Sequence, residues 1–390
     1  MKPMIWALLI VAWALAGCAG QTVEPVTEAA TDLTTLKADV VATYADMVYA
    51  SYQDSLDTAV TLQSALEAFV ADPNEATHQA AKDAWLAARE PYGQTEVYRF
   101  YGGPIDDADG PEGLINAWPL DESYVDYVDG APQAGIINNV AEYAEITPDL
   151  LESLNEMGAE ENISAGYHAI EFLLWGQDLS ADGRSFPDSP TADNAVRRGQ
   201  YLLAAADRLV RHLSELVNEW DPAGSGNYRE TFLAQNPDDA IRQILTGMGV
   251  LSKSELAGER IFVAYDNQDQ EDEHSCFSDN THRDIIANAQ GIYNVFNGRY
   301  TRPDGSVVSG SSLADLLTAV APELATEMQV LADTAVASTT AIHAPFDQAI
   351  VLAEHRPGVL AAVNALQDQG DKIAEVARAL GLTINTDLPE

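Results

Sequence analysis

Residues 33–71 read LTTLKADVVATYADMVYASYQDSLDTAVTLQSALEAFVA and decide how the chain folds. Apolar side chains recur along this stretch at steps of mostly three and four residues, namely Leu33, Leu36, Val40, Tyr44, Met47, Leu56, Val60, Leu66 and Phe69. That spacing places them on one face of an α-helix. The polar turn Asp72-Pro73-Asn74 ends the pattern. We therefore predict one long amphipathic helix over residues 33–71.

The same helical period continues through the rest of the chain. A second pattern covers about 75–101, and a loop rich in Gly, Pro and Asp follows up to residue 121. Further patterns cover about 133–157, 163–175, 191–220, 238–268, 271–297, 311–341 and 354–381, and Pro and Gly clusters at 182–190, 221–226 and 302–310 separate several of them. No stretch shows the sustained alternation of a β-strand. The sequence therefore predicts an all-α protein made of helical bundles.

The chain also contains a weak internal repeat of residue spacing. Steps of four and three residues occur twice, first in Trp85, Arg89, Tyr92, Glu96 and Arg99 and, 170 residues later, in Glu255, Glu259, Phe262, Asp266 and Asp269. Such steps trace one face of a helix. A duplication that produced two related bundles would explain the repeat, as would chance, since the identities barely match.

The N-terminus has the features of a secretory signal. Lys2 precedes a short apolar run, which is too short for a membrane-spanning helix and ends at Leu15-Ala16-Gly17-Cys18. These last four residues resemble the bacterial lipobox, which implies cleavage before Cys18 and a lipid on that cysteine. An ordinary signal with a chance cysteine is the alternative. We predict a signal peptide over 1–17, a flexible tether over 18–31 and a soluble body held at a membrane surface.

The composition is strongly acidic, with 61 acidic and 20 basic side chains. Cleavage would remove one Lys and no acid, so the mature 373 residues would carry 42 net negative charges. Such a surface argues against nucleic acid or an anionic membrane as a partner. A salt-rich habitat or a general attraction of cations would explain it. With Cys18 acylated, Cys276 is the only other cysteine, so His, Asp and Glu must hold any metal.

Gly166-Tyr167-His168-Ala169-Ile170-Glu171 is a G-x-H-x-x-E pattern within an apolar, aromatic run. His168 and Glu171 are three residues apart, so on a helix they share one face. A nitrogen donor beside an oxygen donor can hold a transition metal or divide acid and base work. A histidine of the core without any ligand role is the alternative, because a short H-x-x-E is a weak pattern.

A polar stripe lies upstream of this motif, on the helix face that Trp85 begins. It consists of Arg89, Tyr92, Glu96 and Arg99. The aromatic residues favour burial of the stripe, and buried charges need partners. A ladder of salt bridges on a solvated face would have the same spacing. The glycine-rich loop that follows includes Asp106; it can present a carboxylate to a ligand or simply form a tight turn, and it lacks the spacing of an EF-hand.

The segment 269–282 holds two of the seven histidines among five acidic residues. Glu271 and His274, like Asp279 and His282, are carboxylate–histidine pairs three residues apart. If the segment is helical, one stripe contains Glu271, His274, Ser278 and His282. Glu-x-x-His on facing helices holds metal in di-iron carboxylate bundles, and imidazole with carboxylate suits Fe, Zn or Mn. The segment therefore favours a metal site over its alternative, a solvated acidic face.

Three motifs together resemble the imelysin family, and most of all its iron-regulated lipoprotein branch. They are the run from Trp85 to Asp106, the G-x-H-x-x-E at 166–171, and Leu256-Ala257-Gly258-Glu259-Arg260 followed by the segment 269–282. The resemblance covers about 35–385. It implies an exported all-α protein linked to iron uptake, with two four-helix-bundle-like domains that we place at 32–185 and 190–386. It also implies a peptidase label, with His168 and Glu171 as the metal or catalytic site.

The sequence does not contain a complete peptidase site. H-E-x-x-H with a third ligand is typical of zinc peptidases and G-x-S-x-G of serine hydrolases, and neither pattern occurs. A metallopeptidase with Glu171 as its general base is for this reason kept as an alternative function and not as the main prediction. A scaffold that presents a binding surface to an uptake system is another.

We expect a protein that is lipid-anchored to the outer membrane, facing the periplasm, or to the cell surface. It would bind iron, zinc or another divalent metal, or a metal-bearing ligand, between its two domains. The predicted metal ligands are His168, Glu171, Glu271, His274 and His282. Residues that would surround the metal or clamp an anionic chelator are Arg89, Tyr92, Glu96, Arg99, Asp106, Ser278 and Asp279. Expected partners are the membrane, iron-uptake proteins and the metal or its chelate, and His212, beside Arg208 and Arg211, is expected on a solvated face.

Overall fold

The structure, a computed structural model, describes residues 26–177 and 192–388, and the side chains from residue 33 onward. The predicted signal peptide and Cys18 lie outside the described residues. The end of the predicted tether belongs to the first helix, which begins at Val26. No helix in the described ranges is long and apolar enough to cross a membrane.

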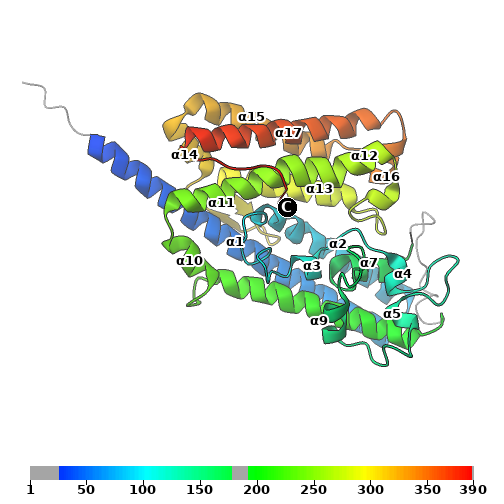
Figure 1. The fold of residues 1–390 in the computed structure, drawn as a ribbon. Coiled ribbons are helices and arrows are strands. Elements are labelled where there is room, and N and C mark those ends of the chain that lie inside the picture. Colours follow the sequence, from blue (N-terminus) through cyan, green and yellow to red (C-terminus); the bar gives the residue numbers. More distant parts are fainter. Residues whose placement is uncertain (1–25, 178–191, 389–390) are drawn as a thin grey trace, which may run out of the picture.

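The predicted long helix is confirmed as α1 (Val26–Ala71), which is the spine of a lower layer of helices (Figure 1). Against it pack α2 (Glu75–Thr95) and α9 (Ala195–Trp220), and α7 (Gly166–Trp175) packs on both of these. The Asn74 side chain accepts hydrogen bonds from the backbone N–H groups of Ala76 and Thr77. The polar turn that ends α1 is thus also the cap that starts α2.

The chain between α2 and α7 forms short elements instead of long helices. They are η1 (Glu96–Tyr98), α3 (Glu112–Ile115), α4 (Glu122–Val125), α5 (Gly135–Asn138) and α6 (Pro148–Leu154). The prediction of one helix over 133–157 is therefore wrong. Gly135 has φ +88° and lies so close to the backbone of residues 125–126 that a Cβ would clash there, which fixes a bend. Thr147 and Pro148 then start a separate helix, since the Thr147 side chain caps its first turn.

The upper layer in Figure 1 consists of the remaining long helices. After α10 (Tyr228–Ala234), one rod is formed by α11 (Pro237–Val250), the π-helix η2 (Leu251–Phe262) and α12 (Val263–Asn267). Beside it lie α13 (Thr281–Asn297), α14 (Leu313–Val320), α15 (Pro322–Thr340), α16 (Phe346–Val351) and α17 (Arg356–Ala379). The predicted helix over 311–341 is interrupted at Ala321, because the following proline favours an extended residue before it.

The described residues also contain one small hairpin that the sequence did not predict. β1 (Arg299–Thr301) pairs antiparallel with β2 (Val307–Ser309). Strands of three residues are too short to show a clear alternation. The all-α class is nevertheless confirmed, because helices form nearly all of the regular structure in the described ranges.

The helix predicted over 271–297 begins only at Thr281. Gln270–Asp272 form one turn of 3-10 helix, η3, and turns follow up to residue 280. The Ser275 N–H donates to Thr281 Oγ1 (3.0 Å), and the Asn280 N–H donates to the Ser275 carbonyl (3.2 Å). Such local bonds compete with helical hydrogen bonding. The expected helical stripe of Glu271, His274, Ser278 and His282 is therefore not formed.

The two layers meet where α2 packs on α13. A Cβ added to Gly93 would lie 2.7 Å from the Ala287 Cβ, and one added to Gly291 would lie 2.5 Å from the Gln94 carbonyl oxygen. Glycine at both positions lets the helices approach closely. This contact brings the polar stripe of α2 against α13 and the turn before it.

Candidate functional site

The two histidine motifs meet in the folded chain. His168 lies on α7 and His274 in the turn before α13, and their ring centroids are 4.8 Å apart in an edge-on contact. The two residues are 1% and 2% exposed. The tertiary structure thus joins motifs that are more than a hundred residues apart.

Each ring is held by a buried carboxylate at Nδ1. His168 Nδ1 lies 2.8 Å from Glu171 Oε2, while Glu171 Oε1 accepts from the Ser278 N–H (2.9 Å) and hydroxyl (2.6 Å). His274 Nδ1 lies 3.2 Å from Asp284 Oδ2. Such a carboxylate fixes the orientation of a histidine, as it does in metal sites.

The second nitrogen of each ring has little to bind. Nε2 of His168 is buried and has no hydrogen-bond partner among the described residues. Nε2 of His274 faces the Asn116 amide nitrogen, at 3.5 Å. The Asn116 orientation is fixed because its oxygen accepts from Arg89 (2.5 Å), so a donor faces Nε2 of His274. Arg89 Nη2 also lies 3.4 Å from His274 Nδ1, but the Asp284 carboxylate is closer, so the proton of the neutral ring sits on Nδ1 and Nε2 keeps its lone pair.

Burial keeps the His168–Glu171 pair uncharged at neutral pH. It raises the pKa of Glu171 to about 8 and lowers the pKa of His168 to about 3. At pH 7 the carboxyl group of Glu171 therefore holds a proton that it can donate to His168 Nδ1, and the ring proton lies on Nε2. A cation arriving at Nε2 would have to displace that proton.

The predicted charged stripe runs from α2 through η1 to Arg99, is largely buried, and pairs its guanidinium groups with carboxylates. Arg89 donates to Asp284 (3.1 Å), Arg99 to Glu96 (2.8 Å), and Arg260 to both Glu96 (2.7 Å) and Glu255 (2.8 Å). Burial acts to raise the pKa of Glu96, but Arg260 and Arg99 outweigh it and lower that pKa to about 2. Because each guanidinium group is already neutralised, the predicted clamp for an anionic chelator lacks free positive charge.

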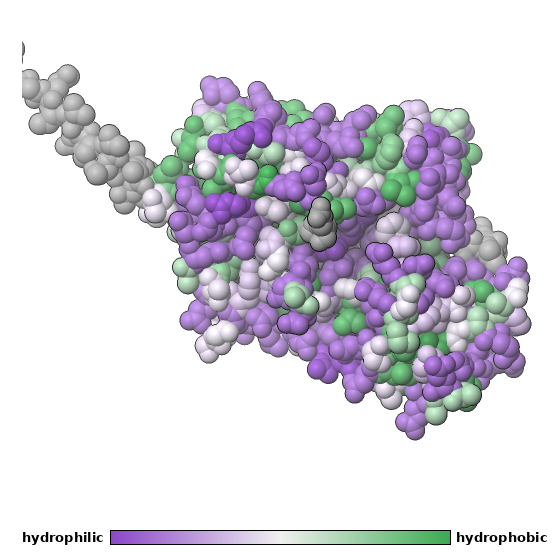
Figure 2. Space-filling model, in the orientation of Figure 1, coloured by the Kyte–Doolittle hydropathy of each residue, from purple (hydrophilic) through white to green (hydrophobic). Residues whose placement is uncertain are grey.

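A polar cavity of about 380 Å³, which we call the junction cavity, opens beside this network. Both layers line it, with Asn116 and Trp118 on one side and Arg260 and His274 on the other. Its exposed carboxylates are Glu156, Glu160 and Glu259. The space-filling view shows the surface hollowed between the layers and surrounded mainly by hydrophilic residues (Figure 2). The cavity therefore attracts cations more readily than anions.

Other predicted site residues lie elsewhere. Glu271 is exposed in η3, and His282 Nδ1 lies 3.1 Å from the carbonyl oxygen of Asp279, which itself has φ +57°. Asp106 closes its own loop by accepting from the backbone N–H groups of Phe100 and Gly103. Tyr92 packs on Tyr167 beneath Arg89.

In the described part of the chain no three His, Cys, Asp or Glu side chains are grouped to hold a metal ion, so the predicted five-residue ligand set is not assembled.

Sequence reasoning missed two central residues, Asp284 and Asn116. Both bond to Arg89, and both are buried. The sequence indicated only that a buried Arg89 needs a partner. It could not select this partner, because Asp284 is 195 residues from Arg89 along the chain.

The prediction that His212 lies on a solvated face is also wrong. His212 is 6% exposed, and the neighbouring Arg208 is 3% exposed. α6 covers this part of α9, where Asp149 and Glu152 pair with Arg208. Arg211 alone of the three faces solvent.

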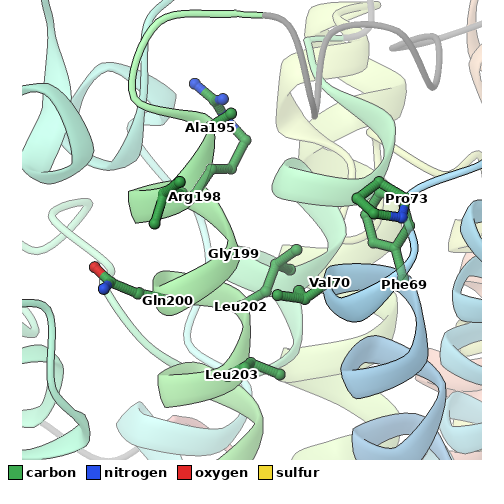
Figure 3. Close-up of a pocket in the computed structure, with 10 residues that line it drawn as sticks. Phe69, Val70, Pro73, Ala195, Arg198, Gly199, Gln200, Leu202 and Leu203 are labelled. Atoms are coloured by element: carbon green, nitrogen blue, oxygen red, sulfur yellow. The ribbon is translucent and has the colours of Figure 1, made fainter.

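A second cavity, of about 350 Å³, lies between the end of α1 and the start of α9 (Figure 3). Apolar side chains such as Phe69, Val70 and Leu202 form much of its wall. The guanidinium group of Arg198, which lines it, is already held by both oxygens of Asp126 (2.6 and 3.0 Å). Its chemistry is therefore less suited to a metal or a charged ligand than the junction cavity.

The stability of the site should depend on pH. Burial lowers the pKa of His274 to about 3 from an ordinary value of 6.5, so its contribution to the free energy of unfolding is present above pH 6.5 and is lost as the pH falls. The lowered pKa of His168 likewise reduces the stability as the pH falls, whereas the raised pKa of Glu171 reduces the stability as the pH rises. Lowering the pH from 6.5 to 5 should reduce the free energy of unfolding of both proteins. The reduction should be about 1–2 kcal/mol smaller in His274→Asn than in the wild type, since one pKa unit is worth about 1.4 kcal/mol. Urea unfolding at both pH values measures this, and equal losses would contradict it.

Comparison with known proteins shows consistent similarities. The sequence model of the family described as imelysin, which carries a peptidase label, matches residues 48–373. The chain is 27% identical over 335 residues to "Iron-regulated protein A" of Synechococcus elongatus, covering 84% of this chain and 82% of that protein. The fold is similar to that of an iron-regulated protein A precursor from Parabacteroides distasonis, with a TM-score of 0.71, 22% identity and coverage of 92% and 97% of the two chains. An imelysin-like protein from Psychrobacter arcticum has a TM-score of 0.63, 14% identity and coverage of 92% and 98%.

Proposed function

The chain belongs to the imelysin family, and on that premise we propose that it takes part in the acquisition of iron or another divalent metal. It would do so by binding the metal, or a metal-bearing ligand, at the junction of its two layers of helices. The iron-regulated relative supports an iron-related role. The metal is the cargo of this protein.

One observation carries the proposal. Two imidazole rings, each bonded at Nδ1 to a buried carboxyl group, lie in contact beside a polar cavity. His274 lines the cavity, and the His168 ring packs edge-on against the His274 ring. A carboxyl group at Nδ1 orients a histidine as a metal ligand, and the ionised Asp284 also increases the basicity of His274.

The spacing of the rings is compatible with one shared ion. With metal–nitrogen bonds of about 2.1 Å and angles between those of octahedral and tetrahedral coordination, two imidazoles that share an ion have ring centroids roughly 4.6–5.3 Å apart, and the observed value is 4.8 Å. Two histidines do not complete a coordination sphere. The remaining donors would be water or groups of a chelator, which is why a metal-bearing ligand fits the cavity as well as a hydrated ion does.

The charge of the cavity selects among such ligands. The arginines beside it are paired with carboxylates, and the exposed carboxylates give its edge a negative charge. A metal complex with a net positive charge would therefore enter more readily than an anionic chelate. We replace the anionic chelator of the sequence-based hypothesis with a cationic or neutral cargo.

Calorimetric titration of the purified protein tests the proposal. Fe(II), Zn(II) and Mn(II) would be added separately, and a ferric complex of an anionic carboxylate chelator would serve as the comparison. We expect one bound equivalent of at least one divalent ion and weaker binding of the anionic complex. Absence of binding in every titration would contradict the proposal and favour a scaffold for an uptake system.

The proposed location is the membrane surface, through a lipid on Cys18, which lies outside the described residues. Cys18→Ser should move the protein from the membrane fraction to the soluble exported fraction, because the acylated residue is lost. Mass spectrometry of the mature N-terminus and fractionation of cells provide the measurement. An unmodified N-terminal peptide in the wild type would contradict the lipid anchor.

The peptidase label of the family supports a second candidate function. A general base must reach the water that it activates. Both oxygens of Glu171 are occupied, one by His168 and the other by Ser278. We therefore expect clean protein to cleave no peptide in a library digest analysed by mass spectrometry. Cleavage that chelators and Glu171→Gln both abolish would reverse this ranking.

A further inference from the structure

A second H-x-x-E pair lies on α9, well away from the junction cavity. His212 and Glu215 are three residues apart, and His212 Nδ1 lies 3.1 Å from Glu215 Oε2. The geometry matches that of His168 and Glu171, where the same atoms are 2.8 Å apart. In both pairs Nε2 of the histidine is buried, and no group in the described part of the chain forms a hydrogen bond with it.

His212 lines a cavity of about 530 Å³ that shares no lining residue with the junction cavity. The histidine is 6% exposed, so a buried polar side chain with one unsatisfied nitrogen forms part of the wall. Because Glu215 is positioned to accept the Nδ1 proton of the ring, Nε2 is left as an acceptor. A buried acceptor without a donor is costly unless a ligand or water supplies one.

The rest of the wall is acidic and partly apolar. Among the described residues that line it, the carboxylates belong to Asp107, Asp109, Glu152, Glu215 and Glu219, and the guanidinium group to Arg211. Four of these acids already have partners, since Glu152 pairs with Arg208, Glu215 with Arg211, Glu219 accepts from the Tyr228 N–H and Asp107 accepts from the Asp109 N–H. Asp109 is exposed on the loop before α3. Leu114 and Leu216 provide apolar surface, and Tyr228 provides an aromatic ring.

We propose that this cavity binds an organic cation, namely a primary amine or guanidinium group carried on an aliphatic chain. The N–H groups of such a ligand would donate to His212 Nε2, and the carboxylates would balance its charge. The apolar wall and the ring of Tyr228 would cover the aliphatic part and the charged end. This site is independent of the proposed metal function.

A bare metal ion fits the cavity less well. In the described part of the chain no three carboxylate or imidazole side chains are grouped for coordination, and the volume exceeds what one ion needs. An extended ligand with several donors uses both the volume and the apolar wall.

Titration with cadaverine at low ionic strength tests the proposal, with a neutral diol of the same length as the matched ligand. His212→Asn retains a group that can donate to Glu215 but removes the Nε2 acceptor. We expect cadaverine to bind the wild type, the diol to leave no signal, and His212→Asn to weaken cadaverine binding about tenfold, as for the loss of one charge-assisted hydrogen bond. His343→Asn, in the upper layer, is the matched control and should bind as the wild type does.

Asp109→Asn provides a variant that does not touch the core. It should weaken cadaverine binding a few-fold through loss of one nearby charge, with an unchanged melting temperature. Equal cadaverine affinity in the wild type and His212→Asn would overturn the proposal, because general acidity would then explain the binding. Binding of Zn(II) that depends on His212, without binding of cadaverine, would also overturn it.

Discussion

Arg89→Met is expected to lower the free energy of unfolding by about 3–5 kcal/mol, as for the removal of one partner of a buried ion pair. Arg89 and Asp284 are each 2% exposed, and the guanidinium also donates to Asn116. Without it, Asp284 would remain as a buried carboxylate whose pKa is at present held far below its usual range by Arg89 and His274. Urea unfolding at pH 7, followed by circular dichroism, measures the loss.

Two comparisons make this prediction specific. Arg242→Met removes an ion pair with Asp239 whose side chains are 43% and 53% exposed, and it should cost less than about 1 kcal/mol. The double variant Arg89→Met/Asp284→Asn should recover part of the stability, because no buried charge is left without its partner. A loss below 1 kcal/mol for Arg89→Met would mean that the network does not hold the two layers together.

His168→Ala is expected to weaken metal binding about tenfold or more, since loss of a single charge-assisted contact costs roughly 1.5–3 kcal/mol. His274→Ala should have an effect of similar size, because it removes the other imidazole of the pair, which lines the cavity. His343→Ala is the control; its ring stacks on His355 in the upper layer, at a centroid distance of 3.7 Å. Calorimetric titration of Fe(II) and Zn(II) into all four proteins gives the comparison.

Metal binding at His168 should also release a proton. At pH 7 the pair of His168 and Glu171 is uncharged, and the metal would displace the proton on Nε2 while Glu171 retains the hydrogen bond to Nδ1. Titrations in buffers with different ionisation enthalpies should show a release of about one proton in the wild type and less in His168→Ala. Equal affinities and equal proton release in the two proteins would remove His168 from the site and leave it as a histidine of the core.

The sequence by itself determined the class of fold and the main helices. The apolar period over 33–71 is a local property, since side chains three and four residues apart lie on one face whatever surrounds the helix. For this reason α1, α7, α9 and α17 lie close to where the periodicity predicts them. The pairing of His168 with Glu171 was predictable for the same reason, because both residues lie within one turn of one helix.

Only the tertiary structure decided which residues form the site. The turn at 273–280 is held by bonds of Ser275 and Thr281 that override a helical pattern, and it turns His274 inward while Glu271 stays exposed. Asp284 joins Arg89 across α2 and α13, and α6 buries His212 on a face that its neighbours indicated as solvated. These outcomes depend on which helices pack together and on how buried charges find their partners, and no local period of the sequence encodes either.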